Sequence, residues 1–172
     1  MPSRVHTLPV QLDITKPFLC IGRLGINYLL VQATHRAYRI IAGGGDEDNS
    51  GNWLHTKVDI AAGGFRGTFA THLHVTDFAR FRDELLDLNA NLTRRETTNR
   101  TATFRSARGT LRLSIEARHT ETFTATCEAS DGGANDTLLL FTLKFDRAEL
   151  PDIVRNLNLM LTEFPLNTEA NV

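Results

Sequence analysis

The chain has 172 residues, 41% of them hydrophobic and 23% charged, and a formal net charge of −1. This length can bury a core without disulfides or metals, and we expect one domain over 1–172 with loosely ordered tails at 1–15 and 166–172. A nearly neutral chain lacks the global field that attracts nucleic acid or an anionic membrane. No apolar run reaches the roughly 18 residues that span a bilayer, and no signal-peptide hydrophobic region opens the chain. We therefore expect a cytoplasmic protein that binds neither nucleic acid nor membrane.

The first half of the chain alternates between strand patterns and glycine-rich breaks. Residues 18–41 are rich in Ile, Leu, Val and Tyr, which predicts two or three strands, and residues 42–51 form a glycine-rich acidic loop. The apolar residues at 54, 58 and 60 alternate with polar ones and indicate another strand. The pair Gly63-Gly64 then predicts a hairpin turn into a strand over 65–75.

Two later stretches share one layout, in which an alternating strand runs straight into a helical pattern. Residues 69–75 lead into a helix over 76–88, and residues 139–145 lead into a helix over 146–160. Both helical stretches space their apolar residues by three, four and three: Phe78, Phe81, Leu85 and Leu88, and then Leu150, Ile153, Leu157 and Met160. Pro151 fits the first turn of the second helix, where its missing N–H costs little. The sequence therefore predicts an internal strand–helix repeat.

The strands between these helices also alternate, over 101–105, 111–118 and 122–129. One apolar and one polar face is typical of antiparallel sheets, whereas parallel strands read as continuous apolar runs. We expect an α+β fold, with a strongly twisted, mainly antiparallel sheet of about seven to nine strands and two helices packed on one face. Cys20 and Cys127 are too few for a disulfide framework and are expected to be free, buried thiols.

No motif in the chain indicates catalysis or a bound cofactor. A nucleophile elbow, HExxH, CxxC and a Rossmann glycine pattern are all missing from the sequence. Acidic residues follow the glycines at 43–45, so this loop would repel a phosphate. Asp46, Asp48 and Ser50 match the first half of a calcium loop, but Lys57 stands where the bidentate Glu is needed. We expect a protein that is not an enzyme and that carries no cofactor.

The histidines offer a weak alternative. His72 and His74 project from the same face of a strand, and His55 lies on the expected neighbouring strand, so the three could share a zinc ion. Because Phe69 and Leu73 occupy the inward face, the histidines face outward. We favour solvated surface histidines and no tightly bound metal.

Charge is segregated along the chain. Six arginines oppose a single Glu96 within 19 residues: Arg94, Arg95, Arg100, Arg105, Arg108 and Arg112. The acidic loop provides the opposite charge: Asp46, Glu47 and Asp48. The only tryptophan, Trp53, follows this loop on the strand face opposite Leu54. We predict a partner-binding surface from Asp46, Glu47, Asp48, Trp53, Arg105, Arg108 and Arg112.

Other readings of these residues stay open. The arginines also suit a solvated face or a nucleic-acid surface, although Phe104 is the only aromatic residue among them that could stack on bases. Trp53 could instead be covered by the preceding loop.

A family resemblance appears at Asn52-Trp53-Leu54. An acidic loop, this tripeptide, an alternating strand, Gly-Gly and a second strand together resemble the bacterial WapI-type immunity proteins. The helix over 76–88 is similar to theirs, as are the late strand Phe141-x-Leu143-x-Phe145-Asp and a final helix that closes on Phe164-Pro165. The resemblance covers 52–165. The helix lacks the Trp often seen in such relatives, and residues 70–73 replace a more apolar stretch.

The resemblance implies a function without catalytic residues. Members of this family are taken to neutralise the toxic C-terminal domain of a polymorphic toxin encoded beside them, by binding it. The leading hypothesis is therefore a non-enzymatic protein that binds a cognate toxin domain stoichiometrically. A small-ligand or metal-binding domain using the histidine-bearing sheet face is the first alternative. A structural protein that self-associates through sheet edges is the second, and a homodimer stays open.

Overall fold

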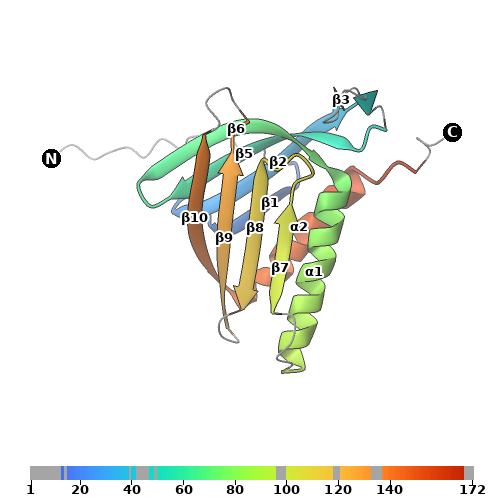
Figure 1. The fold of residues 1–172 in the computed structure, drawn as a ribbon. Helices are drawn as coiled ribbons and strands as arrows, with labels where there is room; N and C mark the ends of the chain where they lie inside the picture. Colours follow the sequence, from blue (N-terminus) through green and yellow to red (C-terminus); the bar gives the residue numbers. More distant parts are fainter. Residues whose placement is uncertain are drawn as a thin grey trace.

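The computed structural model describes residues 13, 15–38, 40–41, 47–48, 50–95, 100–117, 121–132 and 137–168. Its elements follow one order twice, four main strands and then a helix (Figure 1). The first unit consists of β1 (Phe18–Arg23), β2 (Asn27–Ala37), β5 (Trp53–Ala62), β6 (Phe65–His74) and α1 (Val75–Thr93). The second unit consists of β7 (Thr101–Arg105), β8 (Leu111–Ala117), β9 (Thr122–Ser130), β10 (Leu138–Asp146), the short 3-10 helix η1 (Arg147–Glu149) and α2 (Leu150–Glu163). The predicted strand–helix repeat is the end of this larger repeat.

The main strands form two antiparallel sheets, each a simple meander. The first sheet has the order β1-β2-β5-β6, and the second sheet has the order β10-β9-β8-β7. A small pair of strands, β3 (Ile40–Ile41) and β4 (Glu47–Asp48), is inserted between β2 and β5. The predicted α+β class and antiparallel pairing are confirmed. The strands divide between two sheets of four, where the sequence predicted one continuous sheet.

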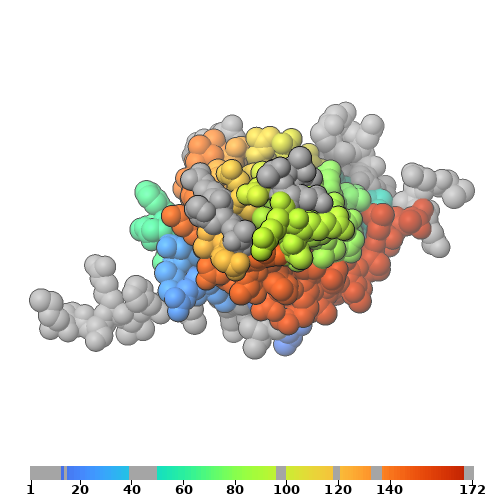
Figure 2. Space-filling model, turned by 90° about the horizontal axis from the view of Figure 1, so that it is seen from below, coloured from blue at the N-terminus to red at the C-terminus, as the bar shows by residue number. Residues whose placement is uncertain are grey.

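Each helix leaves the last strand of its own sheet and packs against the first strand of the other sheet. α1 contacts β7, and α2 contacts β1. The helices also contact one another and lie side by side in the view from below (Figure 2). α2 begins at Leu150 with Pro151 in its first turn, as predicted, whereas α1 continues past the predicted end at 88 because Leu92 is buried in the core. Each unit thus covers part of the other.

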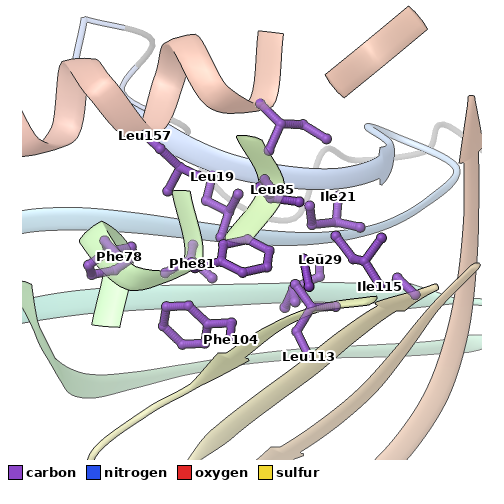
Figure 3. Close-up of a cluster of buried hydrophobic side chains, with 14 of the residues drawn as sticks. Leu19, Ile21, Leu29, Phe78, Phe81, Leu85, Phe104, Leu113, Ile115 and Leu157 are labelled. Carbon is purple, nitrogen blue, oxygen red and sulfur yellow. The ribbon is translucent and has the colours of Figure 1, made fainter. Parts of the chain in front are cut away.

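One core runs through both units. The apolar stripes of the two helices are buried as predicted: Phe78, Phe81, Leu85, Leu88, Leu150, Ile153, Leu157 and Met160. Phe104 of β7 lies between two aromatic rings of α1, with ring centroids 5.4 Å from Phe78 and 5.7 Å from Phe81. Figure 3 shows these rings in one cluster with Leu19 of β1 and Leu157 of α2. Burial of apolar side chains from both sheets and both helices therefore holds the two units together.

Cys20 and Cys127 are both free thiols, as expected. Cys127 is buried as predicted, whereas Cys20 is only partly buried. Burial raises the pKa of each thiol to about 12, so both stay protonated and unreactive near neutral pH. No helix in the described part of the chain is long and apolar enough to span a bilayer.

Candidate functional site

Trp53 forms a stack with residues from two other elements. It starts β5 directly opposite His74 at the end of β6, and the His74 ring meets it edge-on with ring centroids 5.1 Å apart. The guanidinium carbon of Arg108, from the turn between β7 and β8, lies 5.2 Å from the centroid of the indole ring. Trp53 is only 6% exposed, whereas Arg108 is exposed. The expected partner anchor is therefore buried, and the group presented to solvent above it is a guanidinium in cation–π contact.

Asp77 in the first turn of α1 holds the turn that carries Arg108. One of its carboxylate oxygens, Oδ2, accepts hydrogen bonds from the backbone N–H of Ala107 at 3.1 Å and of His74 at 3.2 Å. The other oxygen, Oδ1, pairs with Arg80 at 3.1 Å. Asp77 is 3% exposed, and burial raises the pKa of its carboxyl while these contacts oppose the rise. A buried carboxylate thus ties the second sheet's turn to the first unit's helix.

A row of three histidines crosses the outer face of the first sheet. His35 of β2, His55 of β5 and His72 of β6 are cross-strand neighbours. The ring centroids of His35 and His55 are 4.3 Å apart, and those of His55 and His72 are 4.2 Å apart. The register of β2 shifts at Thr34, whose hydroxyl donates to the carbonyl of His55 at 3.1 Å. This bulge places His35 opposite His55 and so completes the row.

The environment of His55 and of His72 favours a neutral imidazole. Burial lowers the pKa of His55, and the neighbouring His35 lowers it further. Burial also lowers the pKa of His72, followed by the effects of His55, Arg108 and His35. The Nε2 atoms of His55 and His72 are 3.4 Å apart, at the limit of a hydrogen bond. The lowered pKa values favour the uncharged form of His55 and of His72, beside the positively charged Arg108.

The alternative metal set of His55, His72 and His74 is not brought together as such. His74 is the N-cap of α1, and its Nδ1 accepts from the backbone N–H of Thr76 at 3.3 Å. His35 takes the third place beside His55 and His72 instead. No group of three His, Cys, Asp or Glu side chains in the described part of the chain could hold a metal ion. That the purified protein carries no tightly bound metal stays a prediction.

The remaining predicted site residues lie in different places. Arg105 of β7 lies directly opposite Arg112 of β8 in the strand register, and both side chains are exposed on the outer face of the second sheet. Glu47 and Asp48 form β4, whose backbone pairs with Ile41 and Ile40 of β3. Asp46 lies outside the described residues. The structure thus unites Trp53 with Arg108, and places Arg105 and Arg112 on the strands that flank the turn of Arg108.

The two short motifs of the family resemblance meet in space, which the sequence did not reveal. The Asn52 side chain accepts from the backbone N–H of Asn167 at 2.7 Å and donates to its carbonyl at 3.0 Å. Arg36 donates to the carbonyl of Gly51 at 2.7 Å and to that of Pro165, and its guanidinium lies over the Phe164 ring. Asn167, expected in a loose tail, is therefore fixed to the start of β5.

Gly51 explains why this junction is so close. Its φ is +68°, and a Cβ built there would lie 2.9 Å from the Tyr38 ring and 3.1 Å from the Asn167 amide. Glycine adopts this left-handed backbone without strain and leaves room for both neighbours. The junction positions the start of β5, and with it Trp53.

A family model and a solved structure match this chain. A family model described as the immunity protein WapI-like family matches residues 23–165. No curated protein matches the chain. A solved structure titled "Crystal structures of trypanosoma bruciei MRP1/MRP2" is 16% identical, covers 86% of this chain and 85% of that chain, and has a TM-score of 0.45. The family match spans most of the chain, including both motifs that meet at Asn52, and the chain belongs to the immunity protein WapI-like family.

Proposed function

We propose that this protein is a non-enzymatic immunity protein that neutralises a cognate polymorphic-toxin domain in the cytoplasm by binding it one to one. Membership of the WapI-like family supports an immunity function, and such proteins generally act by binding. The surface proposed for the toxin consists of Arg105, Arg108 and Arg112, with Trp53 buried beneath Arg108, and is called the arginine surface below. The toxin would present carboxylates to it, because guanidinium groups bind carboxylates in a bidentate geometry.

The observation that carries this assignment is the fixed position of Arg108. Its guanidinium stacks on the buried Trp53 ring, and the backbone beside it bonds to the buried Asp77. An arginine that is already ordered loses less side-chain entropy on binding than a mobile one, so more of its contact energy appears as affinity. Arginine and tryptophan are also the residue types that most often dominate binding energies at interfaces. Arg105 and Arg112 extend the positive charge along the second sheet.

The test is a double charge reversal with a matched control. Arg105→Glu combined with Arg112→Glu should weaken binding of the cognate toxin domain at least about tenfold, equivalent to ~1.4 kcal/mol, and the loss should shrink at high salt. Arg23→Glu combined with Arg155→Glu changes the net charge equally at exposed sites on β1 and α2. Calorimetric titration and rescue of toxin-inhibited growth measure the effect. Equal affinities for the two double variants would disprove the arginine surface, and the absence of a one-to-one complex would disprove the proposed function.

A further inference from the structure

In the described part of the chain, the strand β10 lies at the margin of the second sheet and pairs with β9 alone (Figure 1). It also contacts β1 and β5 of the first sheet, without pairing with either. Uncovered edge strands offer unpaired N–H and C=O groups to other strands, and monomeric proteins usually protect them with charges, proline or bulges. Residues 137–143 contain no charged residue, no proline and no glycine. The register of β10 with β9 also runs without a bulge from Leu138 to Asp146. The first half of this edge therefore lacks the usual protection.

Large apolar side chains are exposed around the same half of the strand. Leu138 is 55% exposed and Leu140 is 65% exposed, both on the outer face. Leu139 and Phe141 are only partly buried at the margin of the core, whereas Leu143 further along is fully inside. Phe65 at the start of β6 is 69% exposed and shares with Leu138 the lining of a cavity of about 290 Å³. This edge is apolar on both faces of the sheet, which favours a protein partner.

We propose that two copies of this chain associate by pairing their β10 strands antiparallel about a two-fold axis at Leu140, which joins the two second sheets into one sheet of eight strands. In this register Leu140 faces Leu140 of the second copy, Leu139 faces Phe141, and Leu138 faces Thr142. Apolar contacts then form on both faces, and no like charges oppose each other. An axis at Thr142 would instead place Leu140 opposite Lys144 and Leu138 opposite Asp146. The comparison of the two registers favours Leu140 as the centre of the pairing. Because the apolar residues of β10 match themselves about this centre, a second copy of the chain fits as the partner.

The proposed dimer should be weak and should leave the arginine surface free. A single strand pair buries less than the ~1,600 Å² of a standard interface, so the dimer should form in a concentration-dependent way with an affinity near the micromolar range. β10 and β7 lie at opposite margins of the second sheet. Pairing at β10 therefore leaves Arg105 on β7 and Arg112 on β8 open to solvent. This inference does not depend on the proposed function.

Sedimentation velocity over a series from about 1 to 200 µM tests the proposal through mass action. The wild-type protein should shift from monomer to dimer. Leu140→Lys should stay monomeric throughout, because two lysines would oppose each other at the axis. Leu159→Lys on α2 is the matched control, since Leu159 is 52% exposed, and it should dimerise like the wild type. Circular dichroism checks that each variant is folded.

A mixture of two variants tests the position of the axis. Leu140→Lys mixed with Leu140→Glu should restore the dimer mass, because lysine then faces glutamate, whereas each variant alone stays monomeric. A wild-type protein that is monomeric at the highest concentration overturns the proposal, as does a dimer that survives Leu140→Lys. A mixture that stays monomeric while both variants are folded overturns the axis and the proposal with it. Loss of toxin binding in Leu140→Lys, with a monomeric wild type, would assign this edge to the toxin instead.

Discussion

The two units share an order of elements but differ in regularity. The second sheet pairs without any shift of register, and its strands alternate cleanly between core and solvent. The first sheet contains a bulge at Thr34, near the end of β2, and the separate β3–β4 pair is inserted directly after β2. The histidine row and Trp53 lie at this irregular end. A core can thus be repeated while surface features arise where one copy departs from the repeat.

The starts of the two helices show the same contrast. Each helical segment opens with a capping box, formed by His74 and Asp77 in the first unit and by Asp146 and Glu149 in the second. Glu149 is exposed and accepts from the backbone N–H of Asp146 at 3.0 Å. Asp77 is buried and also accepts from Ala107. Glu149 therefore serves as a capping residue, whereas Asp77 caps its helix and also binds the turn between β7 and β8.

The largest expected effect tests whether the two helices contribute equally to the shared core. Phe81 of α1 and Leu157 of α2 are both fully buried. Phe81→Ala should lower the free energy of unfolding by about 3–5 kcal/mol, and Leu157→Ala by about 2–5 kcal/mol, because each leaves a cavity in the same core. Urea unfolding followed by circular dichroism measures both. A single transition is expected for each variant, and a loss below ~1 kcal/mol for either would contradict the shared core.

An intermediate effect should separate the two capping boxes. Asp77→Ala removes the acceptor for two backbone N–H groups and for Arg80, and should cost about 2–3 kcal/mol. Glu149→Ala removes one exposed acceptor and should cost about 0.5–1 kcal/mol. Urea midpoints give the comparison. Asp77→Ala should also free the turn that carries Arg108, so quenching of Trp53 fluorescence by iodide should rise in this variant alone. Equal costs for the two substitutions would remove the special role of Asp77.

The smallest effect concerns pH. The pKa values of His55 and His72 are lowered in the folded protein from 6.5, mainly by burial. As pH falls below about 6.5, the unfolded chain binds protons that the folded chain does not, so the free energy of unfolding falls until the lowered pKa values are passed. Above pH 6.5 both states are neutral and this contribution is constant. His55→Gln with His72→Gln should therefore flatten the profile between pH 7.5 and 5.5 in urea titrations. An unchanged slope would show that the row does not titrate in this window.

Sequence patterns predicted the elements better than their arrangement. The spacing of apolar residues marks each strand and helix, because burial of one face imposes the period. Which strands share a sheet depends on contacts between residues far apart in the chain, so one sheet was expected where two are formed. The last turn of α1 was missed for the same reason. Arg147 donates to the Asn89 side chain at 3.0 Å and to Thr93 at 2.8 Å, which stabilises a polar helix end that local sequence does not favour.

The candidate site contains features that alternation along a strand predicts and others that it cannot predict. Alternation predicted that Trp53 lies on the strand face opposite Leu54 and that His72 lies on the face opposite Leu73, and the strands place them so. Trp53 contacts Arg108, which is 55 positions away in the sequence and lies in a turn of the other sheet, so local sequence could not reveal this contact. His35 was missed because a bulge changes the alternation without any glycine or proline to announce it.

The exchange of helices between the units has a consequence for synthesis of the protein. Once residues 1–93 have left the ribosome, β1 still lacks its partner α2, and α1 still lacks its partner β7. The first unit therefore exposes two apolar surfaces until the last helix emerges. We expect the first unit to reach its final fold only after α2 has emerged, so that neither unit would fold on its own.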